Sequence, residues 1–225
     1  MKGDYIVLQA RLGSKRLPGK LLLPLRGASI LEHILLRLKT SKEAEGIIVA
    51  TTMGTAERII DITEKHGVGI FIGSEDDVLG RYIGAVKEFR IRNVVRATAD
   101  NPLVDIGYLD RALLLHRHSG ADLTCFPRLP YGTGIEVIKG EVLTEIGDLT
   151  QDPFEREHIT QYIYRNEDRF RIVRGTPDSD MDQPDVRLTV DTEDDYRRMK
   201  DLYENLYRGE PIRVSNALDY LHRKG

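Results

Sequence analysis

The chain has 225 residues, of which 33 are Lys or Arg and 36 are Asp or Glu, so its formal net charge at pH 7 is −3. This near balance of charge argues against a general binder of nucleic acid or of an anionic membrane. The single cysteine, Cys125, excludes an intramolecular disulfide and a zinc site built from several thiolates, and we expect it to be buried and unreactive. The chain opens without a signal-peptide pattern, and no apolar run approaches the roughly 20 residues of a membrane span. We therefore expect a cytoplasmic protein.

Short apolar runs rich in Val and Ile alternate with segments of helical periodicity in the first half of the chain. Helix signals lie between them, because Ser29 and Glu32 form a capping-box pair and Gly67 ends the second helical segment. Repeated strand and helix in this order predicts a parallel sheet. The predicted buried strands are YIVLQA (5–10), GIIVATT (46–52), VGIFIG (68–73) and NVVRATA (93–99).

The alternation changes after residue 126. Residues 127–142 read as a loop and an antiparallel strand, 153–166 as a helix, and 170–175 as a short strand. VRLTV (186–190) then restores a buried strand before the helix 193–207. We expect one domain over residues 1–225, an α/β fold with a doubly wound, mainly parallel sheet and a mixed α+β excursion at about 127–176.

Ligands of open parallel sheets bind outside the carboxyl ends of the strands, so the residues that follow each predicted strand are candidates for a site. They combine a basic, glycine-bearing turn with hydroxyl groups and two aspartates. Such a set suits a polyphosphate bound with a divalent cation, because N–H groups and basic side chains meet phosphates while carboxylates hold the metal. The candidates are 11–20, Thr51, Thr52, Ser74, Glu75, Asp76, Asp100 and Asp191.

The basic turn RLGSKRLPGK (11–20) matches neither common phosphate-binding motif. Five residues separate Gly13 from Gly19, and Leu21 stands where a P-loop needs Ser or Thr, so the turn is not a P-loop and is not GxGxxG either. A solvated basic turn ahead of a capped helix is the alternative. Its glycines and its place after the first strand favour a phosphate-binding turn.

The two aspartates differ in whether a purely structural role could explain them. Asp100 begins DNPLVD, where it could simply start an Asx turn before Pro102. Asp191 precedes Thr192, which is the better helix N-cap with Asp195 three residues on, and this leaves Asp191 free for a metal. If both face one metal, we expect the two carboxylates to repel each other in its absence.

Other candidates are weaker. His116 and His118 are two residues apart on a predicted helix and do not share a face. Glu157 and His158 crowd the start of a predicted helix, for which a merely charged helix start is the alternative. The triplet Asp180–Met181–Asp182 resembles the acidic motif of nucleotide-sugar glycosyltransferases, but it follows an outer segment and we expect a loop.

The motifs together resemble a known family over nearly the whole chain. They are similar to the cytidylyltransferases that activate acidic sugars, nearest to the spore-coat polysaccharide branch and more distantly to the 3-deoxy-manno-octulosonate and acylneuraminate enzymes. Asn101 departs from this likeness, because the spore-coat branch often carries Cys there. The motifs are, in order, QARLGSKRLPGK, ATT, GSEDDVLGRY, VRATADNPLVD, YGTGIEV, REHIT and VRLTVDTEDDY.

The resemblance implies a Rossmann-like fold of the nucleotide-diphospho-sugar transferase type and a Mg²⁺-dependent reaction. CTP and a sugar hydroxyl, expected on an acidic sugar, would give a CMP-sugar and pyrophosphate for surface polysaccharide or glycan synthesis. The enzyme would be a homodimer whose excursion forms the dimer contact and part of the sugar pocket. No nucleic-acid or membrane partner is implied.

The resemblance also implies roles for single residues. Asp100 and Asp191 would bind magnesium and act with Lys20 in catalysis, and Ser74 and Thr98 would lie near the base or ribose. The nucleotide would be held by Ala10, Arg11, Gly13, Ser14, Lys20, Thr51, Ser74 and Thr98, with Arg11, Ser14 and Lys20 on the triphosphate. The sugar pocket would contain Glu136, Glu157 and His158.

Two alternatives from other functional classes remain open. A glycosyltransferase that consumes a nucleotide-sugar would depend on Asp180 and Asp182. A non-catalytic regulatory protein would bind a nucleotide as a signal, and the presence of Lys20 with both aspartates argues against it.

Overall fold

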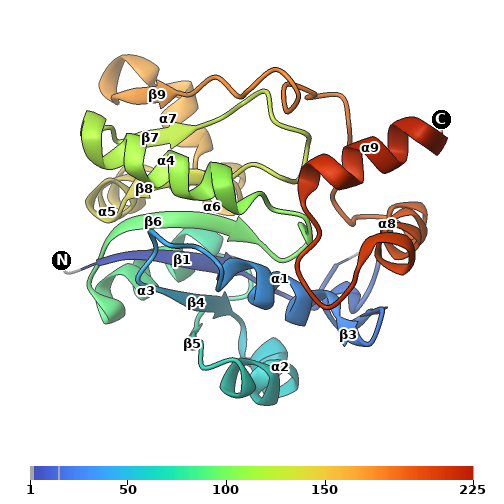
Figure 1. The fold of residues 1–225 in the computed structure, drawn as a ribbon. Coiled ribbons are helices and arrows are strands. Elements are labelled where there is room, and N and C mark those ends of the chain that lie inside the picture. The colour runs from blue at the N-terminus through green and yellow to red at the C-terminus, as the bar shows by residue number, and fades with distance from the viewer. Residues whose placement is uncertain (1–2, 15, 225) are drawn as a thin grey trace.

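The computed structural model describes residues 3–14 and 16–224 and contains a central seven-stranded sheet (Figure 1). The strand order is β5-β4-β1-β6-β8-β7-β9. Strand β8 runs antiparallel to β6 and β7, whereas the pairs β5 and β4, β4 and β1, β1 and β6, and β7 and β9 are parallel. The strands are β1 (Gly3–Gln9), β4 (Gly46–Thr51), β5 (Gly69–Ile72), β6 (Ile91–Thr98), β7 (Leu123–Cys125), β8 (Glu136–Lys139) and β9 (Ile172–Arg174).

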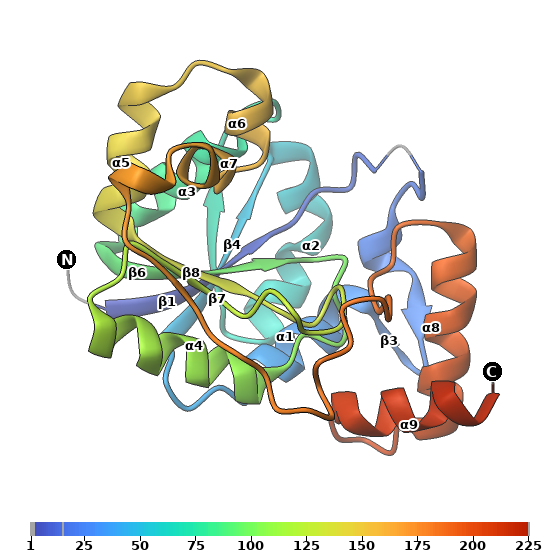
Figure 2. The ribbon, with the colours of Figure 1, turned by 90° about the horizontal axis from the view of Figure 1, so that it is seen from above.

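Helices flank the sheet and extend the molecule to one side of it (Figure 2). They are α1 (Ile30–Leu38), α2 (Met53–Lys65), α3 (Val78–Phe89), α4 (Ile106–Ser119), α5 (Gly140–Leu149), α6 (Pro153–Glu157), α7 (Gln161–Arg165), α8 (Glu193–Leu206) and α9 (Val214–Lys224). Two 3₁₀ turns cover Lys20–Leu22 and Glu167–Arg169, and a small hairpin joins β2 (Pro24–Leu25) to β3 (Ala28–Ser29). None of the helices in the described ranges has the length and apolar character needed to cross a membrane.

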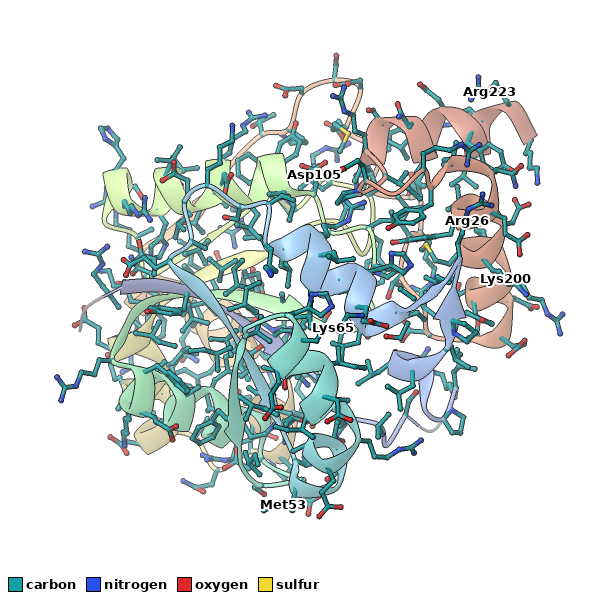
Figure 3. All side chains as sticks on the ribbon, turned by 60° about the horizontal axis from the view of Figure 1, so that its bottom comes forward. Arg26, Met53, Lys65, Asp105, Lys200 and Arg223 are labelled. Atoms are coloured by element: carbon teal, nitrogen blue, oxygen red, sulfur yellow. The ribbon has the colours of Figure 1, made fainter. Side chains whose placement is uncertain are left out.

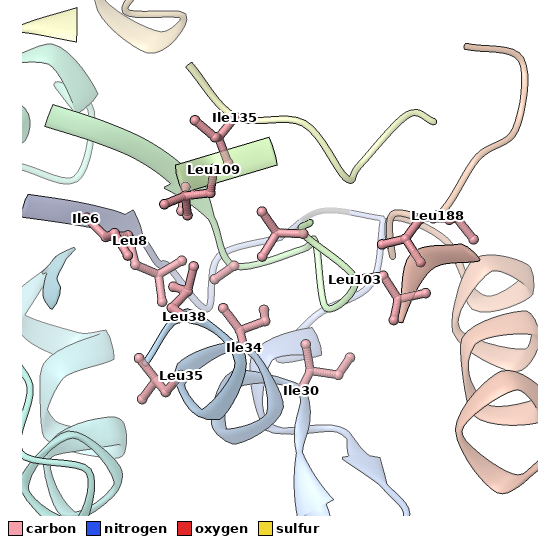
Figure 4. Close-up of a cluster of buried hydrophobic side chains, with 14 of the residues drawn as sticks. Ile6, Leu8, Ile30, Ile34, Leu35, Leu38, Leu103, Leu109, Ile135 and Leu188 are labelled. Atoms are coloured by element: carbon pink, nitrogen blue, oxygen red, sulfur yellow. The ribbon is translucent and has the colours of Figure 1, made fainter. Parts of the chain in front are cut away.

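Each face of the sheet packs against its own hydrophobic core. Successive residues of a strand point to opposite faces, so Ile6 and Leu8 of β1 lie in one cluster and Val7 in the other. The first cluster includes α1 and α4, and Figure 4 shows Ile6 and Leu8 beside Leu38 of α1. The second includes α3 and α5. Helices on both faces confirm the doubly wound α/β fold.

Helix α8 and the β2–β3 hairpin, which lie far apart in the sequence, pack side by side. Tyr196 of α8 donates a hydrogen bond to the Pro24 carbonyl oxygen at 2.8 Å, and Arg26 donates to the Glu204 carbonyl oxygen at 2.9 Å. Figure 3 shows Arg26 and Lys200 on these neighbouring segments. The hairpin begins at Pro24, shortly after the basic turn 11–20, so α8 packs against the segment that leaves this turn.

Several local predictions are confirmed. Ser29 and Glu32 form a reciprocal capping box at the start of α1, and Thr192 and Asp195 do the same for α8. Gly67 ends α2 with φ of 61°, in the left-handed region that glycine adopts without strain. The antiparallel strand expected after residue 127 is β8, and the segment 127–176 adds both β8 and β9 to the main sheet.

Two predicted elements are wrong. Residues 186–190 are extended but form no strand of the sheet, because their N–H groups bond to loops: Leu188 donates to the Tyr131 carbonyl and Val190 to the Asp100 carbonyl, both at 2.8 Å. The helix expected over 153–166 is divided into α6 and α7. His158 ends α6 with φ of −108° and ψ of 77°, which redirects the chain.

Candidate active site

A cleft of about 1120 Å³ opens at the carboxyl ends of β1 and β6. Its walls come from the turn after β1, the loop after β6, the segment before β8, helices α6 and α7, and the residues before α8. The position agrees with the general rule for open α/β sheets. It is lined by ten of the residues expected at the site: Arg11, Gly13, Ser14, Lys20, Thr98, Asp100, Glu136, Glu157, His158 and Asp191.

Three expected nucleotide-binding residues lie outside this lining. Ala10 and Thr51 are buried, and the Thr51 hydroxyl donates to the Ala10 carbonyl oxygen at 2.7 Å, which ties the ends of β1 and β4 together. Ser74 lies in an exposed loop, and its carbonyl oxygen accepts a hydrogen bond from Arg81. In this structure Ala10 and Thr51 support the base of the basic turn, and Ser74 lies beside the cleft rather than in it.

Lys20 is the buried cation of the basic turn. Gly19, with φ of 68°, takes a left-handed conformation and starts the 3₁₀ turn that carries Lys20. The Nζ atom of Lys20 donates to the Val190 carbonyl oxygen at 2.9 Å, to Asp191 Oδ1 at 3.1 Å and to Asp100 Oδ2 at 3.2 Å. The expected repulsion between the two aspartates is therefore offset by an ammonium group that lies between them.

Asp191 joins three basic side chains. Besides Lys20, its carboxylate pairs with Arg16 at 3.1 Å and with Arg187 at 2.5 Å. The Asp191 N–H donates to Asp195 Oδ2 at 3.1 Å, so the capping box of α8 fixes the backbone beneath the carboxylate. Although Asp191 does not end a central strand, contrary to our expectation, the hydrogen bond from Val190 to the Asp100 carbonyl brings it to the same place.

Asp100 is held by its own loop. Thr98 donates to Asp100 Oδ1 at 2.7 Å, and Asn101 donates to the Thr98 hydroxyl at 2.9 Å. The other carboxylate oxygen faces Lys20. The carboxylate of Asp100 thus points toward the basic turn and Asp191, as a residue that shares a site with them must.

Glu136 forms a saturated polar cluster on the opposite wall of the cleft. Arg96 of β6 and Glu136 of β8 are cross-strand partners, and their side chains pair at 2.8 Å. Glu136 also accepts hydrogen bonds from Tyr164 at 2.7 Å and Thr160 at 3.2 Å. Burial and then the Glu136 charge raise the pKa of Tyr164, so its hydroxyl stays a donor. This wall presents neutral hydroxyl groups and a paired carboxylate.

Glu157 and His158 lie at the end of α6. Glu157 Oε1 accepts a hydrogen bond from Arg11 at 2.7 Å, which connects α6 to the basic turn. The His158 side chain is exposed, and its ring packs against Phe154 in a tilted arrangement with centroids 4.6 Å apart. Both residues line the cleft at the point where α6 ends.

The donor set fits a divalent cation that arrives with a phosphate ligand. Over residues 3–14 and 16–224, no three His, Cys, Asp or Glu side chains are grouped so as to hold a metal ion by themselves. Asp100 and Asp191 offer two carboxylates, and Mg²⁺ in proteins is commonly held by one or two carboxylates together with substrate phosphates. The two aspartates suit that mode.

Comparison with known proteins supplies the family. The sequence pattern of the cytidylyltransferase family matches residues 5–213. The chain belongs to the cytidylyltransferase family. This confirms the resemblance found in the sequence motifs, and it fits a cleft that combines a basic turn with two aspartates.

Individual relatives agree with this assignment. The cytidylyltransferase is 31% identical to the spore coat polysaccharide biosynthesis protein SpsF of Bacillus subtilis, over 99% of this chain and 95% of that protein. A solved cytidylyltransferase from Leptospira borgpetersenii superposes with a TM-score of 0.93 at 30% identity, over 100% of this chain and 95% of that one. A synthetase of CMP-2-keto-3-deoxy-manno-octonic acid, solved with CTP, shares the fold at a TM-score of 0.68 and 17% identity, over 90% and 99% of the two chains.

Several residues of this cytidylyltransferase cleft were not expected as site residues. Arg96 had a signal, since it interrupts an otherwise apolar strand where an unpaired charge would be costly. The sequence gives no such signal for Arg187, because its pairing with Asp191 depends on how an irregular segment folds. The residues that were not expected but contact the expected ones include Arg96, Thr160 and Tyr164 in the lining and Arg187 beside it.

Proposed function

We propose that this cytidylyltransferase transfers CMP from CTP to a hydroxyl group of an acidic sugar, with Mg²⁺ as the divalent cation and pyrophosphate as the second product. The observation that carries the proposal is Lys20, whose ammonium group bridges Asp100 and Asp191 beside a basic turn at the carboxyl ends of the strands. This arrangement places cationic and anionic groups within one cleft, as nucleotidyl transfer to a hydroxyl requires.

The basic turn is suited to the triphosphate. Arg11, Arg16 and Lys20 all line the cleft, and each is paired with a carboxylate in this structure. The turn is held by its own backbone, since Gly19 N–H donates to the Leu12 carbonyl at 3.3 Å. A preformed turn reduces the entropy lost when its side chains are transferred to phosphate oxygens.

Asp100 and Asp191 would hold the Mg²⁺. When bound, the ion would neutralise charge on the reacting phosphates and on the leaving pyrophosphate. The chain's own part is to keep both carboxylates oriented, through Thr98 for Asp100 and through Asp195 and Arg187 for Asp191. Lys20 keeps the Val190 carbonyl as a partner whether or not the carboxylates turn to the ion.

The nature of the sugar and the biological setting rest on the relatives. SpsF is named for spore coat polysaccharide synthesis, and the structural neighbour solved with CTP is named for an acidic sugar. We therefore assign the product to surface polysaccharide or glycan synthesis. The cytoplasm as the place of reaction and the homodimer remain predictions.

The glycosyltransferase alternative finds less support. Asp182 pairs with Arg128 at 2.7 Å on the surface, and Asp180 borders a separate cavity of about 370 Å³ next to α4 and α9. Neither belongs to the lining of the main cleft. An acidic pair that served a nucleotide-sugar would be expected in the cleft.

Pyrophosphate release tests the proposal. CTP, UTP, ATP and GTP would each be combined with Mg²⁺ and one of a panel of sugars: 3-deoxy-manno-octulosonate, its 8-amino-3,8-dideoxy form, N-acetylneuraminate, and neutral hexoses as controls. We expect release with CTP and an acidic sugar, and none after chelation of the metal. The proposal would be contradicted if pyrophosphate were released only with neutral sugars, or only with a nucleotide other than CTP. It would also be contradicted if the enzyme transferred the sugar from a CMP-sugar and released no pyrophosphate from CTP.

A further inference from the structure

The carboxylates of the cleft differ in the hydrogen bonds and ion pairs that they already make. Glu136 accepts from Arg96, Thr160 and Tyr164, and Asp191 pairs with three cations. Asp100 is bonded on both oxygens, to Thr98 and to Lys20. These three carboxylates have their oxygens engaged by groups that belong to the wall of the cleft. A proton acceptor for a substrate hydroxyl has to be sought elsewhere.

Glu157 is engaged differently. Its bond to Arg11, at 2.7 Å, uses one carboxylate oxygen, and both side chains are about one-third exposed, at 36% for Arg11 and 31% for Glu157. Exposed ion pairs of this kind are weak, because solvent screens the two charges. The partner of Glu157 is moreover a cation of the basic turn that a triphosphate would attract.

A second arginine lies near this pair. Arg81 of α3 is buried with 1% of its surface exposed, and among the described residues its Nε and Nη2 atoms have no hydrogen-bond partner. Burial lowers the pKa of Arg81, the charge of Arg11 lowers it further, and the charge of Glu157 opposes this. Arg81 donates to the carbonyl oxygens of Ser74 and Glu75, so this second cation belongs to the loop after β5 that borders the cleft.

We infer that Glu157 is released from Arg11 by the triphosphate of CTP and then accepts the proton of the attacking sugar hydroxyl. This inference rests on the proposed function. The sugar oxygen forms a bond to the α-phosphorus while the bond from that phosphorus to the bridging oxygen breaks. Pyrophosphate leaves with the electron pair, and the hydroxyl proton passes to the Glu157 carboxylate. Binding of CTP thereby prepares the site for the sugar.

The two remaining carboxylates of the lining are less suited to this task. Glu75 and Asp76 lie in the exposed loop after β5, and Glu75 Oε1 is 3.5 Å from where a side chain on Gly13 would begin. Glu75 thus lies against the turn expected to hold phosphates. It provides a control, because Glu75→Gln removes the same charge from the same cleft without freeing Arg11.

Two measurements on Glu157→Gln test the inference. The first is CTP affinity by calorimetry with Mg²⁺, where loss of the competing partner of Arg11 should tighten binding about threefold relative to Glu75→Gln, within the range of exposed ion pairs. The second is kcat for pyrophosphate release with a sugar that the wild-type enzyme uses, where loss of a general base should lower kcat by about 10²–10⁴-fold. Glu157→Asp should recover part of this loss.

The outcomes separate the inference from the proposed function. CTP affinity of Glu157→Gln no higher than that of Glu75→Gln, or a kcat within tenfold of wild type, would overturn the role of Glu157 and leave cytidylyl transfer standing. If the wild-type enzyme bound CTP but released no pyrophosphate with any sugar, both the proposed function and the role of Glu157 as proton acceptor would be contradicted. Calorimetric binding of CTP also shows that each variant is folded.

Discussion

The ammonium nitrogen of Lys20 lies 3.1 Å from Oδ1 of Asp191, and the same nitrogen bonds to Asp100 at 3.2 Å. Lys20 therefore lies between the two carboxylates to which we assign the divalent cation. A metal ion and the lysine compete for the same oxygens unless a phosphate draws the ammonium group aside. Substitution of Lys20, Asp100 or Asp191 should therefore change both stability and activity in ways that can be measured.

Lys20→Met should separate stability from activity. Loss of the ammonium group leaves two facing carboxylates without their shared donor, which should lower the free energy of unfolding in chelator by roughly 1–3 kcal/mol. Mg²⁺ should then raise the melting temperature of the variant more than that of wild type, because it no longer competes with Lys20. Pyrophosphate release should fall by about 10²–10³-fold, as for loss of a preorganised charge donor. Thermal melting in chelator and in Mg²⁺ and turnover assays measure these effects. Equal Mg²⁺ shifts in the two proteins would contradict a shared site.

The two aspartates should be essential for activity but unequal in stability. Asp191→Asn weakens pairing with Lys20, Arg16 and Arg187, and its carboxylate is 11% exposed against 30% for Asp100, so it should cost more stability than Asp100→Asn. Both variants should lose Mg²⁺-dependent pyrophosphate release by at least 10²-fold. Chemical denaturation and turnover would be compared with the same measurements on the control Asp180→Asn.

The control distinguishes two chemistries. Asp180 lies outside the cleft, so Asp180→Asn should retain wild-type turnover. Turnover that survives in Asp100→Asn and Asp191→Asn but is lost in Asp180→Asn would favour the acidic triplet and a glycosyltransferase.

The fold was predictable where local patterns carry the information. The alternation of apolar strands with capped helices predicts a parallel sheet, and Ser29, Glu32 and Gly67 act within a few residues of where they stand. The segment 186–190 has the same β-branched pattern as a strand, yet its hydrogen bonds go to two loops. The sequence pattern predicts that a segment is extended and buried, but it does not predict which carbonyl groups accept hydrogen bonds from its N–H groups.

The candidate site was predictable only as a set of strand ends. Arg11, Lys20 and Asp100 converge because the sheet brings the ends of β1 and β6 together, as the carboxyl-end rule states in advance. Asp191 follows no strand of the sheet and reaches the same place through the hydrogen bond from Val190 to the Asp100 carbonyl. The pairing of Lys20 with both aspartates could not be read from the sequence. It depends on distances set by Gly19 and by an irregular segment, neither of which has a periodic signature.

Stability should depend on pH through Glu32. Hydrogen bonds from Lys65 and from the Ser29 backbone lower the pKa of Glu32 from 4.5 to about 2. The depressed value means that folding favours the carboxylate, so this stabilisation is full above pH 4.5 and is lost as pH falls toward 2. Glu32→Gln should therefore be less stable than wild type by roughly 1–3 kcal/mol at pH 7.

The difference between the two proteins should shrink on acidification. Urea denaturation at pH 7, 4 and 2.5 measures it, provided that both proteins are folded at the lowest pH without urea. Turnover at pH 7 should be unchanged, since Glu32 lies in the capping box of α1 and not in the lining of the cleft. A stability difference that stays constant over this range would show that the charge of Glu32 has no part in it.

The homodimer expected from the sequence gives the last prediction. Residues 127–176 carry three large apolar side chains at the surface, Tyr131, Leu149 and Phe154, exposed by 57%, 45% and 48%. Exposed aromatic and aliphatic side chains of this size are typical of protein interfaces. Phe154 also packs against His158 of the cleft wall, so an interface there would lie near the sugar end of the site. We therefore expect Phe154→Asp to weaken the dimer.

Met53 provides the matched control, because it is 61% exposed and lies at the start of α2, outside the segment 127–176 (Figure 3). Gel filtration with light scattering should show a wild-type dimer at micromolar concentration, a dimer for Met53→Asp, and a dimer dissociation constant at least tenfold higher for Phe154→Asp. Both substitutions place a carboxylate on an exposed apolar side chain, so a general effect of charge would act on the two alike. A monomeric wild-type protein would contradict the predicted homodimer. Equal weakening of the dimer by both variants would show that Phe154 has no special part in the contact. Because burying the introduced carboxylate in an interface is costly only where the side chain is covered, the comparison reports directly on which surface meets the second copy.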